Sequence, residues 1–179
     1  MDELLQACEE LDIGEESCAL IRQAGQRRAA VTALIGQGHL QDALKLLTRL
    51  LPHRYVVAWL CQCMRDESLP ESDLAGVAIA ERWVREPEER HRRAAYEFAV
   101  ADNYRSLGAW VAATAGFAGG SLAPKEQEVA VPPPPHLTSR AATAALNLLA
   151  AVQPEAFDER RAAFMRRAIY LLGDEPDAV

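Results

Sequence analysis

GGSLAPKEQEVAVPPPPHLTSR, residues 119–140, is the stretch around which the rest of the chain is organised, because it cannot form a helix. Gly119-Gly120 ends one helical pattern, and Thr138 can cap the next. The four prolines at 132–135 lack backbone N–H donors and have φ fixed near about −65°. Such a run favours a polyproline II rod, which stays solvated unless something docks on it. The sequence therefore predicts a long Gly/Pro-rich loop over residues 119–137.

The composition of this loop leaves open what it touches. A loop of this length inside a compact domain is normally either functional or disordered, and its apolar residues are many for a disordered linker. It can pack on its own helices, against Trp83 or Trp110, or it can bind a partner, since polyproline II segments dock in aromatic-lined grooves. A plain linker is the third alternative. The candidate partner-binding residues are Leu122, Pro124, Val131, Pro132, Pro133, Pro134, Pro135 and His136.

The rest of the chain carries helical patterns. It has 179 residues, of which 50% are hydrophobic and only 6% aromatic, and a high alanine content suits closely packed helices. Residues 39–51 place leucines at helical spacing on one face, and residues 55–64 are apolar on nearly every side, as in a buried central helix. We expect an all-α fold, a compact multi-helix bundle of helical hairpins. One domain over 1–179 is expected, with two small halves as the alternative and a frayed tail over 174–179.

Several helix boundaries carry local signals. Ser68-Leu69-Pro70-Glu71 resembles a capping box, Pro87 stands where the first turn of a helix is expected, and Ser106 is a candidate N-cap. The pairs Glu88–Arg92 and Glu89–Arg93 have i, i+4 spacing, so the arginine clusters at 90–93 and 160–167 are interpreted as solvated helix faces.

One internal echo indicates a possible duplication. His53-Arg54 and His91-Arg92 each precede a Ser-Leu pair by fifteen residues, an offset of 38 residues between the two blocks. That period lies in the range of helical repeats, although two blocks are fewer than a solenoid needs.

Charge and cysteine usage exclude several classes of protein. The net charge of −7 does not favour nucleic-acid binding, which wants a basic face. No stretch approaches the roughly 18 uninterrupted apolar residues of a membrane span, and the acidic start is unlike a secretory signal. The expected location is cytoplasmic. The four cysteines match neither a disulfide framework nor a zinc pattern, so buried reduced thiols are expected.

No catalytic, cofactor or metal motif is present in the sequence. The histidines are not spaced as in HExxH, and no phosphate-binding glycine loop or nucleophile motif occurs. A non-enzymatic interaction protein is therefore expected, with no cofactor and no metal. Two alternatives stay open. An immunity-type protein would bind a basic toxin through its acidic surface, and a small-molecule or catalytic site under the loop would use His91, Tyr96, His136 or Arg140.

Three runs of sequence carry a family resemblance. AERWVREPEERHRRAAYEFA at 80–99, SLGAWVAATAGFAGGSLAP at 106–124 and VPPPPHLTSRAATAAL at 131–146 resemble an uncharacterised family of small bacterial proteins associated with type VI secretion gene clusters. The resemblance covers about residues 80–151. It implies an accessory role, as an adaptor or chaperone-like factor that loads secreted effectors. The implied partner is another protein, an effector or a component of the secretion system, and no catalytic residues carry over.

Overall fold

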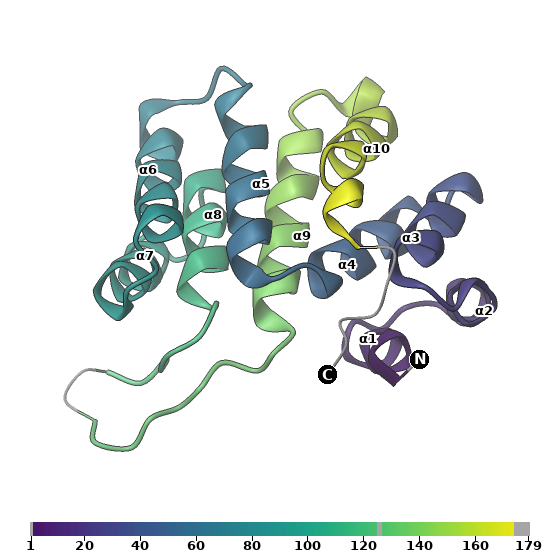
Figure 1. Ribbon diagram of the computed structural model, residues 1–179. Coiled ribbons are helices and arrows are strands. Elements are labelled where there is room, and N and C mark those ends of the chain that lie inside the picture. Colours follow the sequence, from purple (N-terminus) through teal and green to yellow (C-terminus); the bar gives the residue numbers. More distant parts are fainter. Residues whose placement is uncertain (1, 125–126, 174–179) are drawn as a thin grey trace. The chain divides into compact units, whose positions relative to one another are not determined.

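The computed structural model describes residues 2–124 and 127–173, and every regular element in these ranges is helical (Figure 1). The predicted all-α bundle is confirmed. By packing, the chain divides into two compact units, one formed by residues 1–51 with 150–179 and the other by residues 52–149. The prediction of a single domain over 1–179 stays a prediction, and the tail at 174–179 lies outside the described residues.

The first unit is built around a leucine-rich helix. It contains α1 (Asp2–Glu10), α2 (Glu15–Ala24), α3 (Arg27–Gly36), α4 (Leu40–Leu50), α10 (Phe157–Ala168) and the short 3-10 turns η1 (Pro154–Ala156) and η2 (Ile169–Leu171). Helix α4 packs against α1, α3 and α10. Its predicted apolar face is buried apart from Leu40, which is partly buried, and Leu46 is buried as well, so leucines cover more than one stripe of this helix.

The second unit surrounds a helix of small residues. It contains α5 (His53–Arg65), α6 (Glu71–Arg85), α7 (Glu89–Ala101), α8 (Leu107–Gly116) and all of α9 (Leu137–Ala150) but its last residue. Helix α8 packs against α5, α6 and α7, and nearly all of its residues are buried. Helix α5 buries most of the apolar run 55–64, although Tyr55 at its start is exposed.

Two glycines explain how closely α6 and α8 approach. A Cβ on Gly76 would lie 2.1 Å from the carbonyl oxygen of Gly108, and a Cβ on Gly108 would lie 2.5 Å from the carbonyl oxygen of Asp73. The Asp73 carboxylate also accepts a hydrogen bond from the Gly108 amide at 2.8 Å. The start of α8 is therefore held against α6 by direct backbone contact and by a side-chain cap that comes from a neighbouring helix.

The predicted caps had mixed outcomes. Ser106 accepts a hydrogen bond from the Ala109 amide at 3.1 Å and caps α8, as predicted. The capping box at Ser68 is wrong, because α6 begins at Glu71 after Pro70. A helix capped by Ser68 would need α-helical backbone at Leu69, and a residue that precedes proline avoids that conformation.

Two further boundaries differ from expectation. Pro87 lies before the N-cap of α7, which is Glu88, rather than in its first turn. Thr138 does not cap α9, because this helix already begins at Leu137 and the Thr138 side chain is buried within it. The Leu137 amide donates instead to the carbonyl oxygen of Pro134 at 3.0 Å, so the proline run itself leads into the helix.

The two blocks of the 38-residue echo correspond to two helical hairpins, α5–α6 and α7–α8. The second hairpin does not simply stack beside the first, since α8 contacts α5 and α6 as well as α7. Helix α8 therefore contacts both helices of the first hairpin. In a solenoid, by contrast, successive repeats stack through the same repeated interface. A duplication therefore stays a prediction.

Two sequence expectations concern the whole chain. All four cysteines are free and buried, as predicted. Burial raises the pKa of the Cys61 thiol to about 12, so that thiol is protonated at neutral pH. Among the described residues, no helix combines the length and the apolar character that a membrane crossing requires.

Candidate functional site: an exposed loop with a fixed base

The long loop connects α8 to α9 and runs from Phe117 to His136. Figure 1 shows its two arms leaving the ends of these helices and extending away from the helices of the second unit. The first arm includes residues 119–124 and the second includes residues 127–136. The second arm is exposed over most of its length, and Val129 is 71% exposed. In the first arm only Gly120 and Pro124 are exposed, and Ala123 is buried.

Hydrogen bonds join the two arms near the body. The Leu122 amide donates to the carbonyl oxygen of Val131 at 2.8 Å. The Ser121 hydroxyl oxygen accepts from two amides, that of Ala123 at 3.1 Å and that of Val131 at 3.0 Å. One serine side chain therefore ties a residue of its own arm to the opposite arm. Residues 121–123 with Val131 form what we call the loop base.

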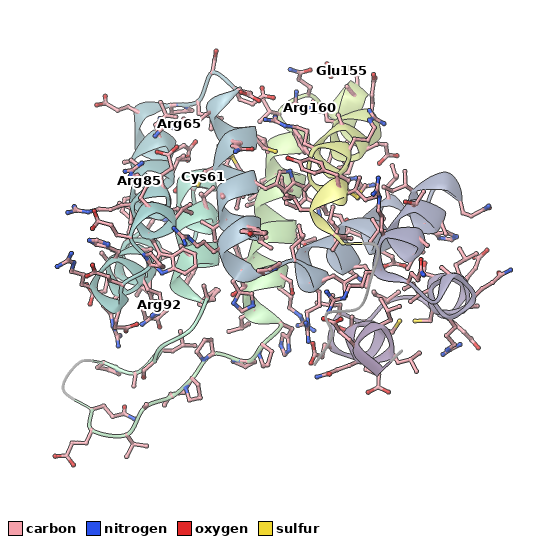
Figure 2. The ribbon with its side chains drawn as sticks, viewed as in Figure 1. Cys61, Arg65, Arg85, Arg92, Glu155 and Arg160 are labelled. Atoms are coloured by element: carbon pink, nitrogen blue, oxygen red, sulfur yellow. The ribbon has the colours of Figure 1, made fainter. Side chains whose placement is uncertain are left out.

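A buried arginine fixes the loop base to the helices. The Arg92 side chain, on α7, is only 3% exposed. Its Nη1 donates to the carbonyl oxygen of Gly116 at the end of α8, and its Nη2 donates to that of Ser121 at 3.0 Å. The next residue, Arg93, donates to the carbonyl oxygen of Ala123 at 2.7 Å. Figure 2 shows Arg92 on the helix beside the first arm.

The charge of this arginine is balanced on the same helix. Arg92 Nε and Nη2 donate to the two carboxylate oxygens of Glu89, both at 2.6 Å. The hydrogen bond from Arg92 lowers the pKa of Glu89 below its usual range. Burying a charged side chain costs free energy unless the charge is paired and hydrogen-bonded. Arg92 meets both conditions, because it pairs with Glu89 and donates to carbonyl oxygens.

A glycine is required where the first arm passes this ion pair. Gly120 has φ of +65°, and a Cβ at this position would lie 2.4 Å from Arg92 Nε and 2.5 Å from a Glu89 carboxylate oxygen. Both the backbone conformation and the close approach of these side chains therefore favour glycine at this position. The sequence predicts Gly119-Gly120 as a helix terminator, and the structure adds this close approach to a side chain on α7.

The structure places the predicted partner-binding residues along both arms. Pro124, Val131, Pro132, Pro134 and Pro135 are exposed, whereas Leu122, Pro133 and His136 are partly buried. The prolines lie between the loop base and the start of α9, so both ends of the run are held by hydrogen bonds. Their exposure argues against the alternative in which the run packs on Trp83 or Trp110.

Of the four residues proposed for a site under the loop, His91 and Tyr96 make contacts with their neighbours on and beside α7. His91 is buried, its Nδ1 lies 2.9 Å from the carbonyl oxygen of Glu86, and its Nε2 accepts from Arg90 at 3.2 Å. Both ring nitrogens therefore have hydrogen-bond partners, one on α7 and one just before it. The Tyr96 ring lies on α7 against Phe117, with centroids 6.1 Å apart, whereas His136 and Arg140 lie one turn apart at the start of α9. Within the residues that the structure describes, no group of three or more His, Cys, Asp or Glu side chains could hold a metal.

Sequence reasoning missed Arg92. The interpretation of residues 90–93 as a solvated face is correct for Arg90, which is 67% exposed, and wrong for Arg92 and Arg93, whose side chains are 3% and 12% exposed. The predicted partner Glu88 instead lies 3.0 Å from Arg90, while the Glu89–Arg93 pair is present at 3.9 Å.

The second arginine cluster also departs from expectation. The Arg161 side chain is mostly buried, stacked over the Phe157 ring, with its Nη1 donating to Gln41 and its Nη2 donating to Asp158. The apolar ring and the two polar partners together explain how a charged side chain is accommodated inside the first unit.

The comparisons with known proteins give a family and no function. A model described as a family of unknown function, DUF6931, matches residues 30–172, which include four-fifths of the chain and the whole loop. Neither the curated proteins nor the solved structures gave a match. The match leaves only α1, α2 and the start of α3 outside it at the N-terminus. Because the model covers well over half of the sequence, this chain is a member of the DUF6931 family.

Proposed function

We propose that this protein is a non-enzymatic interaction module that presents the loop over residues 121–136 to another protein. The observation that carries the proposal is the combination of an exposed proline run with a base fixed by the buried Arg92. A loop held in this way loses less conformational freedom on binding than a free linker would lose.

The chemistry of the second arm indicates the kind of surface it would meet. Proline rings and the exposed side chains of Val129 and Val131 offer apolar area but few N–H donors. Such a segment fits a groove lined by aromatic side chains, the common receptor for extended proline-rich peptides. The proposed partner is therefore a folded protein with an aromatic groove, rather than a nucleic acid.

The cellular role follows from the resemblance of residues 80–151. We propose an accessory factor of a type VI secretion system, an adaptor or chaperone-like protein whose partner is an effector or a component of the apparatus. Support for this role comes from the resemblance alone. The fixed loop is consistent with it, because an adaptor needs a surface that engages a second protein without a reaction.

A second candidate function is an immunity-type protein that blocks a basic toxin. The net charge of −7 supports this alternative, since an acidic surface steers a basic partner. The two candidates differ in their dependence on salt. Binding through charged surfaces weakens strongly as ionic strength rises, whereas binding through prolines and valines does not.

Site-specific crosslinking tests the proposed binding surface. A photo-reactive residue placed at Val129 should capture a partner in cells, whereas one placed at Tyr170, which is 64% exposed in the first unit, should not. The double change Pro133→Ala and Pro134→Ala should abolish the capture. The matched control, Val152→Ala with Tyr170→Ala, removes exposed apolar side chains elsewhere and should leave it intact. Equal capture from Val129 and Tyr170, or capture that survives loss of the prolines, would count against the proposal.

A further inference from the structure

Two His-Arg pairs lie at the starts of the first helices of the two hairpins in the second unit. His53 and Arg54 are the first two residues of α5, and His91 and Arg92 lie in the first turn of α7. These are the pairs that repeat after 38 residues in the sequence. All four side chains contact backbone carbonyl oxygens at or just beyond the C-terminal ends of α6 and α8. We call the four side chains the His-Arg brace.

The first pair divides its side chains between two helix ends. His53 Nδ1 lies 3.2 Å from the carbonyl oxygen of Ala118, just beyond the end of α8. Arg54 Nε donates at 2.8 Å to the carbonyl oxygen of Val84, and its Nη2 donates at 3.4 Å to that of Arg85, at the end of α6. The histidine therefore contacts the other hairpin, while the arginine caps the second helix of its own.

The second pair makes the reciprocal contacts. His91 Nδ1 lies 2.9 Å from the carbonyl oxygen of Glu86, the residue that follows α6. Arg92 Nη1 donates to the carbonyl oxygen of Gly116, the last residue of α8. Here too the histidine contacts the end of the other hairpin and the arginine caps its own. Reciprocal contacts of this kind are those of two equivalent bodies related by a twofold axis.

The spacing of the contacted residues in the sequence agrees with this equivalence. Glu86 and Ala118, which the two histidines contact, are 32 residues apart. The same interval separates Gly76 from Gly108, the two glycines that approach each other where α6 packs on α8. A residue that lies on a twofold axis contacts its own equivalent. The two hairpins therefore share one framework, and the loop is attached at one of its two helix ends.

We propose that His53 is a second positioning residue for the loop, which together with Arg92 fixes the point where the first arm leaves α8. The last carbonyl groups of a helix have no partner within the helix. Those at the end of α8 are held from two sides, by His53 on α5 and by Arg92 on α7, and Arg92 also donates to the carbonyl oxygen of Ser121 in the loop base. This inference rests on the proposed function in taking the loop as the surface that is presented to a partner.

The contacts determine which ring nitrogen of each histidine carries hydrogen. A carbonyl oxygen only accepts, so Nδ1 must be the protonated nitrogen in the neutral forms of His53 and His91. At His91 the other nitrogen accepts from Arg90 Nε at 3.2 Å, which requires the same tautomer. NMR of the full-length protein labelled with 15N-histidine should show Nδ1–H at both residues. The signals of His53 are identified by their loss in His53→Asn, and an Nε2–H tautomer at His53 would overturn the proposal.

Three variants of His53 test its role in positioning the loop. In His53→Leu, amide exchange over residues 118–123 should accelerate roughly two- to tenfold, the range expected for one lost hydrogen bond. His53→Asn should restore slow exchange, because its amide nitrogen is attached to Cγ, as Nδ1 is. His53→Gln should not restore it, because its amide nitrogen lies one carbon further out. A loss of general stability would not distinguish the asparagine from the glutamine variant.

Arg54 provides the matched control within the same pair. In Arg54→Met, exchange should accelerate at Glu86 and Glu88, after α6, and stay unchanged over residues 118–123. The proposal is overturned if His53→Leu leaves exchange over 118–123 unchanged, if His53→Gln restores it as well as His53→Asn, or if both pair members act on the same segment. The tautomer is measured in the wild type, so it decides even where a variant fails to fold. Exchange and NMR use the protein alone, so they are independent of the crosslinking from Val129 that tests the proposed function.

Discussion

The Arg92 guanidinium and the Glu89 carboxylate form a two-point ion pair on α7, with both N–O distances at 2.6 Å. The pair is asymmetric, because Arg92 is buried and Glu89 is 57% exposed. Arg92 Nη2 also donates to the carbonyl oxygen of Ser121, and Nη1 donates to that of Gly116. One side chain thus connects α7, the end of α8 and the first arm of the loop.

Replacing Arg92 should release the loop base. In Arg92→Met, the carbonyl oxygens of Gly116 and Ser121 lose a charged donor, and hydrogen bonds to charged groups contribute about 1.5–3 kcal/mol each. We expect the free energy of unfolding to fall by about 2–4 kcal/mol, since Glu89 itself returns to water at little cost. Amide exchange at residues 121–123 should accelerate more than exchange in α5 and α6. Denaturant unfolding and hydrogen-exchange mass spectrometry measure the two effects.

The neighbouring Arg90 provides the matched control for this change. Arg90→Met removes the same charge from the same helix at a side chain that is 67% exposed. Changes at such surface positions stay within about 0.5 kcal/mol, so this variant should unfold like the wild type. Equal losses in the two variants would show that Arg92 acts only through net charge and has no special role in holding the loop.

Gly120 should tolerate alanine much less than another glycine with the same backbone conformation. Gly120→Ala places a Cβ 2.4 Å from Arg92 Nε, whereas Gly25→Ala, at φ of +69°, meets nothing within 4 Å. The left-handed conformation alone costs roughly 1–2 kcal/mol, which is the loss expected for Gly25→Ala. We expect a further loss of about 1–3 kcal/mol for Gly120→Ala from the steric conflict, measured by denaturant unfolding. If the two variants lose the same stability, Arg92 and Glu89 move aside easily and the base is not rigid.

These residues also show how far the sequence could predict the fold and the loop. Ser106 was found because an N-cap depends on neighbouring residues alone. The leucine face of α4 was found for the same reason, since periodicity is local. The Ser68 cap failed where a second local rule, the restriction on residues before proline, overrode the first.

Arg92 could not be distinguished from Arg90 and Arg93 in the sequence. All three have acidic residues at helical spacing, and only tertiary packing decides that Arg90 is exposed while the Arg92 and Arg93 side chains are largely buried. The loop was predicted from its glycines and prolines, yet its fixed base depends on hydrogen bonds between residues that are far apart in sequence, such as Arg92 and Ser121. No pattern of spacing encodes those contacts.

Glu89 gives the ion pair a dependence on pH. Its pKa in the folded protein is lowered, first by the hydrogen bond from Arg92, from an ordinary value of 4.5. A carboxyl whose folded pKa is depressed stabilises the protein above its unfolded pKa, and this contribution disappears as the pH falls through the folded pKa. The free energy of unfolding of the wild type should therefore drop below about pH 4.5 more than that of Glu89→Gln. NMR titration of the Glu89 carboxyl should give a midpoint below 4.5 in the wild type, and Arg92→Met should raise it. An unshifted midpoint in the wild type would contradict the ion pair.

The contact between α6 and α8 should be the least tolerant of added volume. A Cβ at Gly76 would lie 2.1 Å from the carbonyl oxygen of Gly108, which belongs to the backbone of a buried helix and has no side-chain freedom to move. Gly76→Ala must therefore separate the helices, and overpacking of this kind costs about 1–3 kcal/mol or more.

Gly36 is the control, because it is also helical but its Cβ would meet nothing within 4 Å. Gly36→Ala should stabilise the protein by about 0.4–1 kcal/mol, since it restricts the unfolded chain without a clash. Thermal and denaturant unfolding should both show a loss of stability for Gly76→Ala and a gain for Gly36→Ala. Helix propensity alone would favour alanine at both positions, so opposite effects of the two variants would assign the difference to packing. A gain in stability for both variants would mean that the backbone contact between α6 and α8 is absent in solution.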